Sequence, residues 1–271
     1  MRHPLRSVVV VAFAVMAALL AAPGTATAGD TPVGYDVSHP QCGTTLPLHR
    51  AFAVVGINGG LATRTNPCLA AQLGWASRSS GAVATQPHAQ LYLNTANPGE
   101  SLELVTTWPG RGATPYGFCV GTNSMACSWQ YGWERAQHSI VAFFTPAAWE
   151  AQVDSRPARY SWWLDVETMN TWQSGSTQAL ARNRATLEGM TAYLESRGAT
   201  VGLYSTARQW RQIVGTVGPA SDLAGRDSWL AGSTSLTGAR AACASPSLVP
   251  RGRVVLTQYV VGGLDRNHAC R

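Results

Sequence analysis

Two carboxylates, Asp165 and Glu167, follow directly on a short aromatic and apolar run at residues 161–164. Such a run predicts a buried strand. Because strand side chains alternate, both acids point to one face while Leu164 and Val166 point to the other, with the Cα atoms of the two acids roughly 6.5–7 Å apart. Two carboxyl groups beside apolar bulk can be held at different pKa values, as acid/base work on a glycosidic bond requires. The plainer alternative is a strand that ends in two solvated acids, but ionisable pairs rarely follow buried aromatics without a use.

Apolar runs of strand length alternate with helix-like segments along the chain after residue 28. The expected strands are residues 34–38, 51–58, 90–95, 161–167, 201–205, 229–231 and 254–259. The expected helices lie just after residue 66 and over 129–144, 176–197 and 210–214. This alternation predicts an α/β protein with a parallel sheet. Asp36, Asp165, Glu167 and Asp265 all lie at or just after expected strand ends, which favours a single TIM-like (β/α) barrel domain over 29–271 with its active residues at one end.

Residues 1–28 have the features of a secretory signal peptide. Arg2 and Arg6 form a charged start, residues 8–22 an apolar core, and residues 26–28 a small-residue cleavage site. A retained membrane anchor is the weaker alternative because the apolar run is short for a bilayer span, and no later stretch could cross one. We therefore expect a secreted, extracellular protein, with association with the cell wall as a further option.

The charge balance limits the classes of partner. The formal net charge of the chain is +6, which becomes +4 without the two arginines of the signal. This mild positive balance suits an anionic cell envelope, and the absence of a dense basic run argues against nucleic acid.

Six cysteines follow the signal, and none forms a C-x-x-C pair that would indicate a metal or redox site. An even count in an exported chain predicts three disulfides, for which fifteen pairings are possible. We expect neighbours to pair, as Cys42–Cys68, Cys119–Cys127 and Cys243–Cys270, and the middle pair would close one short polar loop. That loop belongs to a long segment, 96–128, of functional or inserted character. We expect no metal and no cofactor.

Six short motifs occur in a fixed order along the chain: DVSHPQ at 36–41, FAVV at 52–55, LDVE at 164–167, GLYST at 202–206, WLA at 229–231, and QY at 258–259 followed by GLD at 263–265. In this order they resemble the glycoside hydrolase family 25 lysozymes, the Chalaropsis-type muramidases. Each motif alone is weak, whereas the first, third and last together are fairly specific.

The resemblance implies a modified, flattened (β/α) barrel that hydrolyses the β-1,4 bond after N-acetylmuramic acid in peptidoglycan. Carried over by matching position, Glu167 would be the general acid and Asp165 would orient or polarise the N-acetyl group of the substrate. Asp36 and Asp265 would line the same acidic cleft. Like charges nearby raise a carboxyl pKa, which would keep Glu167 protonated long enough to donate.

The chain departs from the family pattern at two strand ends. Residues 56–60 are GINGG where the family usually carries K-A-T-E-G, and residues 92–94 are YLN where it carries Y-H-F. The cysteine-containing segment after Pro98 is also unusual. We place these differences on the cleft rim, where they affect substrate preference more than chemistry.

Four further residues are candidates for substrate binding. Trp172, just past the acids, could stack on a sugar face, although most of the ten tryptophans belong to the core. Tyr204 and Tyr259 could hydrogen-bond sugar hydroxyls or simply pack, and Gln258 adjoins Tyr259 in its motif. No G-x-S-x-G context surrounds Ser38, which argues against a serine hydrolase.

Two alternative functions stay open. A cell-wall carbohydrate-binding protein of the same fold could have lost turnover, although the presence of all four acids argues against it. A hydrolase of another amino-sugar polymer would also fit the altered rim. In each case we expect a monomer that acts on peptidoglycan or a related polysaccharide.

Overall fold

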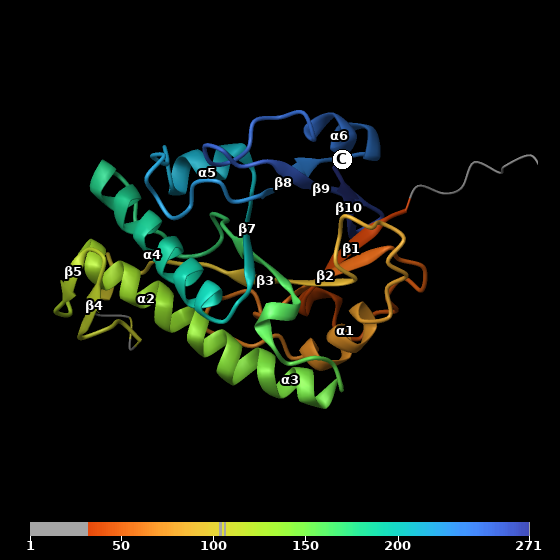
Figure 1. Cartoon of the computed structure of the whole chain (residues 1–271), viewed down its shortest axis with the longest axis horizontal. Helices are drawn as coiled ribbons and strands as arrows, with labels where there is room; N and C mark the ends of the chain where they lie inside the picture. Colours follow the sequence, from red (N-terminus) through yellow and green to blue (C-terminus); the bar gives the residue numbers. More distant parts are fainter. Residues whose placement is uncertain (1–31, 103–104, 106, 271) are drawn as a thin grey trace, which may run out of the picture. The chain divides into compact units, whose positions relative to one another are not determined.

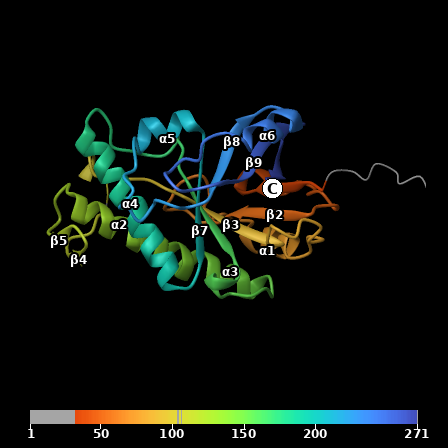
Figure 2. The ribbon, with the colours of Figure 1, turned by 45° about the horizontal axis from the view of Figure 1, so that its top comes forward.

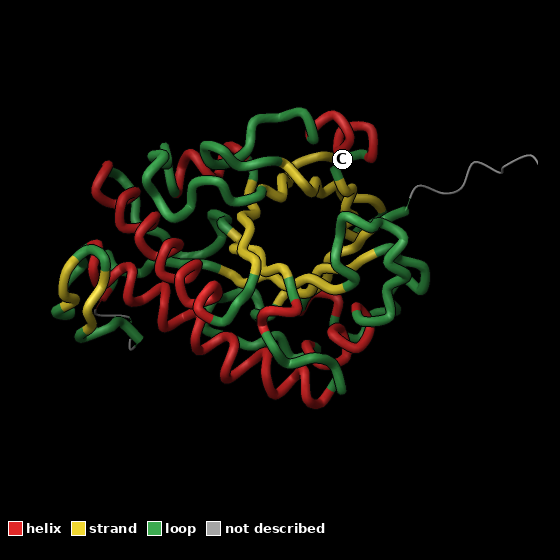
Figure 3. Tube along the Cα trace, in the orientation of Figure 1, coloured by secondary structure: helices red, strands yellow, loops and turns green. Residues whose placement is uncertain are grey.

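Eight strands close into a barrel in the computed structural model, which describes residues 32–270 except 103, 104 and 106. The predicted signal peptide, 1–28, lies outside the described residues. Around the barrel the order is β1 (Gly34–Val37), β10 (Leu264–Ala269), β9 (Val254–Val261), β8 (Ser228–Ser233), β7 (Thr200–Ser205), β6 (Ser161–Asp165), β3 (Ala89–Asn94) and β2 (Phe52–Gly56). The strands form a ring with the helices outside it (Figure 3). The predicted single-domain α/β barrel is confirmed.

One barrel strand, β10, was not expected from the sequence. It pairs antiparallel with both β9 and β1, whereas every other neighbouring pair in the ring is parallel. Gly262 and Gly263 join β9 to β10 and both have positive φ, 64° and 76°. A two-residue turn with positive φ at both positions matches the twist of a hairpin, so the chain reverses and returns as a strand.

Most of the helices lie where the apolar periodicity of the sequence predicts them. They are α1 (Leu69–Ala76), α2 (Met125–His138), α3 (Thr145–Glu150), α4 (Thr177–Ser196), α5 (Ala207–Ile213) and α6 (Leu236–Ala242), of which α3 and α6 were not predicted. A π-helical segment, Ser139–Phe144, connects α2 to α3, and 3-10 turns occupy His39–Gln41 and Pro157–Arg159. Among the described residues, no helix has the length and apolar character needed to cross a membrane.

Helices α2 and α4 run side by side in both Figure 1 and Figure 2. Two glycines allow this close approach. A Cβ atom on Gly132 would stand 1.9 Å from the carbonyl oxygen of Thr186, and one on Gly189 would stand 2.0 Å from that of Trp129. Because no side chain fits at such distances, the backbones of the two helices meet directly. Helix α4 packs against β7, and residues of both helices, such as Ala136 and Leu187, join the outer core cluster.

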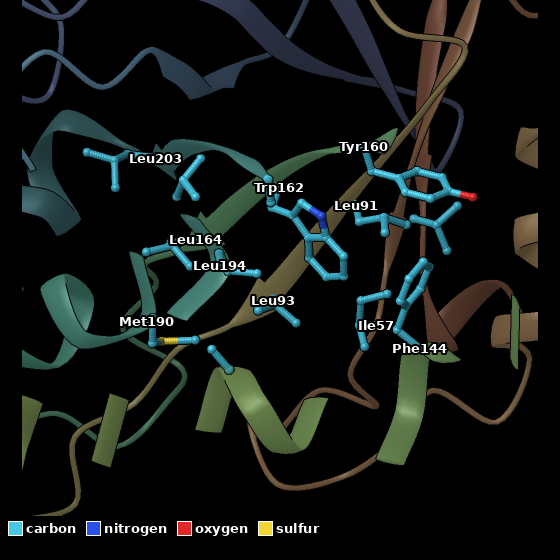
Figure 4. Packing of buried hydrophobic residues seen from close by; sticks show 14 of the residues in the cluster. Ile57, Leu91, Leu93, Phe144, Tyr160, Trp162, Leu164, Met190, Leu194 and Leu203 are labelled. Atoms are coloured by element: carbon cyan, nitrogen blue, oxygen red, sulfur yellow. The ribbon is translucent and has the colours of Figure 1, made fainter. Parts of the chain in front are cut away.

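Strand alternation divides the apolar side chains into two cores. Leu91, Leu93, Trp162 and Leu164 point outward and pack with residues such as Phe144 from the helical layer (Figure 4). A smaller cluster fills the barrel interior; its buried members are Ala51, Phe52, Val54, Trp163, Tyr204, Trp229 and Leu256. Alternate residues of one strand thus serve different cores, which fixes the direction of the polar side chains between them.

The three predicted disulfides are confirmed, as Cys42–Cys68, Cys119–Cys127 and Cys243–Cys270. The middle bridge ties α2 to a small hairpin made of β4 (Gly112–Thr114) and β5 (Gly117–Cys119). Among the described residues of the long segment before α2, this hairpin contains the only strands.

Candidate active site

The four predicted acids meet in one pocket. Asp36, Asp165, Glu167 and Asp265 line a cavity of about 100 Å³ together with Tyr92, Tyr204, Trp229 and Gln258. Asp165 is the last residue of β6, Glu167 follows it by two, and Tyr204 is the Cα partner of Asp165 on β7. The pocket therefore lies at the carboxyl ends of the parallel strands, the end at which (β/α) barrels hold their active sites.

Asp265 reaches the pocket by a different route from the other acids. It lies near the start of β10 and is the direct Cα partner of Asp36 on β1. Residues directly opposite each other in an antiparallel pair place their side chains on the same face. The reversal of β10 therefore brings the two aspartates together inside the barrel mouth.

Asp36 is fully enclosed and held by two amides. Gln258 Nε2 donates to its Oδ1 at 3.0 Å, and Asn267 Nδ2 donates to its Oδ2 at 2.7 Å. The hydroxyl of Tyr204 in turn donates to Gln258 Oε1 at 2.9 Å, which fixes the orientation of that amide. Burial, and next the charge of Asp265, raise the pKa of Asp36 to about 8 despite these donors.

Asp165 is buried with one oxygen satisfied and the other free. Asn94 Nδ2 donates to its Oδ2 at 2.9 Å, while its Oδ1 has no hydrogen-bond partner among the described residues. Burial first, and then the charges of Glu167 and Asp36, raise the pKa of Asp165 well above its usual value. In the ionised form of Asp165, Oδ1 would be a buried acceptor without a donor, which is costly.

Glu167 is less buried than Asp36 and Asp165. Burial and the charge of Asp265 raise its pKa, and burial raises that of Asp265. Four carboxyls in one small pocket cannot all be ionised, since like charges at short range disfavour each other. The protonated form of Glu167, at the more open side of the pocket, is thereby favoured relative to a solvent-exposed glutamate.

Aromatic rings form the floor of the site. Trp229 lies 4.3 Å from Tyr204, 5.7 Å from Trp163 and 6.4 Å from Tyr92 between ring centroids. Trp229 and Tyr92 were not among the residues that we predicted for the site. Strand alternation in the WLA motif and around residue 92 could have indicated them, because it directs both side chains into the barrel.

The structure does not bring Trp172 or Tyr259 into this pocket. The Trp172 indole N–H donates to the backbone oxygen of Glu167 at 2.9 Å, and its ring packs against the outer core. Tyr259 is buried. It follows Gln258 along β9, so it points to the opposite face of the strand. Within the described residues, no group of His, Cys, Asp and Glu could hold a metal ion.

Comparisons with known proteins find a lysozyme-like family and a muramidase structure. A family model described as Lysozyme-like protein 1 (Lys-1) matches residues 153–224, the part that contains Asp165, Glu167 and Tyr204. A muramidase from Trichobolus zukalii has a similar structure, with a TM-score of 0.51 and 15% identity over 88% of this chain and 93% of that chain.

The chain has a lysozyme-like barrel fold. The bacterial lysozyme from Streptomyces coelicolor also matches, at 20% identity over 89% of this chain and 93% of that chain, with a TM-score of 0.46. No curated protein matches in sequence. The family match bears out the predicted resemblance to lysozymes, and at 15% identity the likeness to the muramidase shows the fold alone.

Proposed function

We propose that this protein is a secreted glycoside hydrolase that cleaves β-1,4 bonds of peptidoglycan, with Glu167 as the general acid. The observation that carries the proposal is the convergence of four carboxyls with raised pKa values in one pocket at the barrel mouth. The lysozyme-like family match and the structural neighbour described as a muramidase support a glycoside hydrolase.

The chemistry follows from the two acids of the β6 end. Protonated Glu167 donates to the leaving 4-oxygen as the bond from that oxygen to the anomeric carbon breaks. Asp165 Oδ1 accepts the N–H of the substrate acetamido group and so orients it toward the positive charge that develops at the anomeric carbon. Water then supplies the new hydroxyl on that carbon, and its proton returns to the carboxylates of the pocket.

The size of the pocket limits what it can enclose. At about 100 Å³ it is smaller than the ~300–1,000 Å³ of typical small-molecule sites. An acetamido group or a ring edge fits, whereas a polymer would lie across the mouth. Cleavage inside a long chain needs such an open arrangement. Three disulfides support an exported protein, because these bonds persist in oxidising compartments.

Digestion of purified peptidoglycan followed by mass analysis of the released fragments tests the proposal. We expect soluble muropeptides whose new reducing ends are N-acetylmuramic acid. Release from chitin instead would favour the alternative of another amino-sugar polymer. Binding to peptidoglycan without any release would favour a wall-binding protein and overturn the proposal.

A further inference from the structure

The two segments in which the sequence departs from the family 25 pattern are in direct contact. Asn58 follows β2 and is fully buried, and Asn94 ends β3 and is 6% exposed. Asn58 Oδ1 accepts the backbone N–H of Asn94 at 3.0 Å, and Asn58 Nδ2 donates to the carbonyl oxygen of Ala62 at 3.2 Å. Two departures that are distant in sequence thus form one hydrogen-bonded unit beside the mouth of the barrel.

This unit ends on a carboxylate of the candidate site. Asn94 is the Cα partner of Asp165 across the parallel pair β3–β6, and its Nδ2 donates to Asp165 Oδ2. The backbone is held at the same point, since Thr95 N–H and Thr95 Oγ1 both donate to the carbonyl oxygen of Asp165, at 3.2 and 2.5 Å. Of the two carboxylate oxygens of Asp165, Oδ1 alone has no hydrogen-bond partner among the described residues.

We propose that Asn58 and Asn94 are positioning residues that hold the Asp165 carboxylate in one orientation, with Oδ1 reserved for a donor on the substrate. The inference rests on the proposed function for the identity of that donor, an acetamido N–H. The departures from the family pattern then support the Asp165 carboxylate through hydrogen bonds. They are not confined to sugar contacts on the rim, where we had placed them.

The physical reasoning concerns rotation and charge. A carboxylate with neither oxygen bonded can turn about its χ2 torsion, which is broad and two-fold. An amide donor at 2.9 Å fixes one oxygen and thereby the direction of the other. The same donor favours the ionised form of Asp165, against burial and against the neighbouring acids. Asn58 contributes one step further back by fixing the backbone of Asn94.

A titration that needs no enzymatic activity tests the positioning role. The ¹³C carboxyl signal of Asp165, assigned with an Asp165→Asn variant, is followed against pH in the wild-type protein and in Asn94→Leu, which keeps similar volume without a donor. The titratable groups that face Asp165 are Asp36 on β1, Tyr92 on β3, Tyr204 on β7, Asp265 on β10 and Glu167 itself. We expect the midpoint of Asp165 to rise by about one pH unit, the size of one lost charge-assisted hydrogen bond.

Matched variants keep this titration decisive. Asn94→Ala also removes the donor and cannot clash, so it replaces Asn94→Leu if the latter does not fold. Asn58→Ala should shift the midpoint in the same direction by less. Asn183→Leu is the control, because Asn183 is a fully buried amide on α4 that donates to Gln173 and Ile213 carbonyls away from the pocket. An unchanged midpoint in both Asn94 variants would overturn the inference.

Turnover gives a second readout that a merely structural role would not move. Asn94→Leu should lower kcat for peptidoglycan about 10–100-fold. In an Asp165→Asn background the same substitution should cost almost nothing more, because its effect passes through Asp165. Equal losses in the two backgrounds would contradict the inference. Inactive wild-type protein would contradict the proposed function, while the titration would still decide the role of Asn94.

Discussion

The two ends of the barrel interior are both polar, but their polar groups are satisfied differently. At the amino end, where the parallel strands begin, a cavity of about 300 Å³ is lined by residues that include Gln86, Gln90 and Trp163. Trp163 Nε1 donates to Gln90 Oε1, Gln90 Nε2 donates to Gln86 Oε1, and Gln86 Nε2 donates to the carbonyl oxygen of Val255. Each side-chain amide of this end is engaged by the protein.

The carboxyl end has the smaller cavity and the unsatisfied groups. Its carboxyls have raised pKa values, and Asp165 Oδ1 lacks a partner in the described residues. Cavity volume alone would therefore select the wrong end. Groups that cost folding energy and remain unpaired indicate function, whereas a closed amide network indicates stability.

The largest expected difference between the two ends concerns Asp165 at the carboxyl end. Asp165→Asn should lower turnover on peptidoglycan about 10²–10³-fold, the usual loss for one oriented electrostatic group in a buried site. The free energy of unfolding at pH 7 should not fall, because the variant removes a carboxyl that burial and two neighbouring acids disfavour. Steady-state kinetics with chemical denaturation of the same samples checks both statements. A large loss of stability would mean that this end also serves the fold.

Gln90 should give the opposite result. Gln90→Leu leaves Trp163 Nε1 without an acceptor and Gln86 Oε1 without a donor, so it should lower the free energy of unfolding by about 1–3 kcal/mol. Turnover should stay within about two-fold of wild type, a small loss on the rate scale. Denaturant titration and the peptidoglycan assay measure the two effects. A loss of activity without a loss of stability would remove the distinction between the ends.

The smallest expected effect is the pH dependence of the free energy of unfolding, which the raised pKa of Asp36 at the carboxyl end should produce. The pKa of Asp36 is raised from 3.8 to about 8, so the folded protein holds this proton more tightly than the unfolded chain. Its contribution is fully present below pH 3.8 and is lost as the pH rises toward about 8. We expect the free energy of unfolding to be higher at pH 5 than at pH 8, by at least about 1 kcal/mol. Asp36→Asn should flatten this slope, and a slope that persists in that variant would contradict the assignment.

The sequence was sufficient to predict the convergence of the acids on the parallel strands. Asp36 and Asp165 lie in short apolar strands, and the carboxyl ends of parallel strands must meet at one edge of the barrel. Asp265 lies in the pocket, but on β10 and not in a loop after the preceding strand, because the paired glycines before it were not interpreted as a hairpin turn. The disulfides followed from pairing neighbours along the chain.

Strand alternation also decides which of two consecutive site candidates lines the pocket. Gln258 and Tyr259 are consecutive on β9, so only one of them could face the pocket, and it is Gln258. Trp172 lies in a loop, whose direction no periodicity fixes. Asn94 could not be recognised because its role depends on the register between β3 and β6, a long-range pairing that a single sequence does not specify.

One measurement tests the central claim that the carboxyl end performs general acid catalysis through Glu167. Release of reducing ends from purified peptidoglycan is compared for wild type, Glu167→Gln and Glu195→Gln, with circular dichroism to verify folding. Glu195 lies on α4 and pairs with Arg226 on the surface, so its loss should be neutral. We predict that Glu167→Gln, which keeps the shape but cannot donate the proton, lowers turnover ~10²–10⁴-fold while the protein stays folded. Full activity in folded Glu167→Gln would contradict the account.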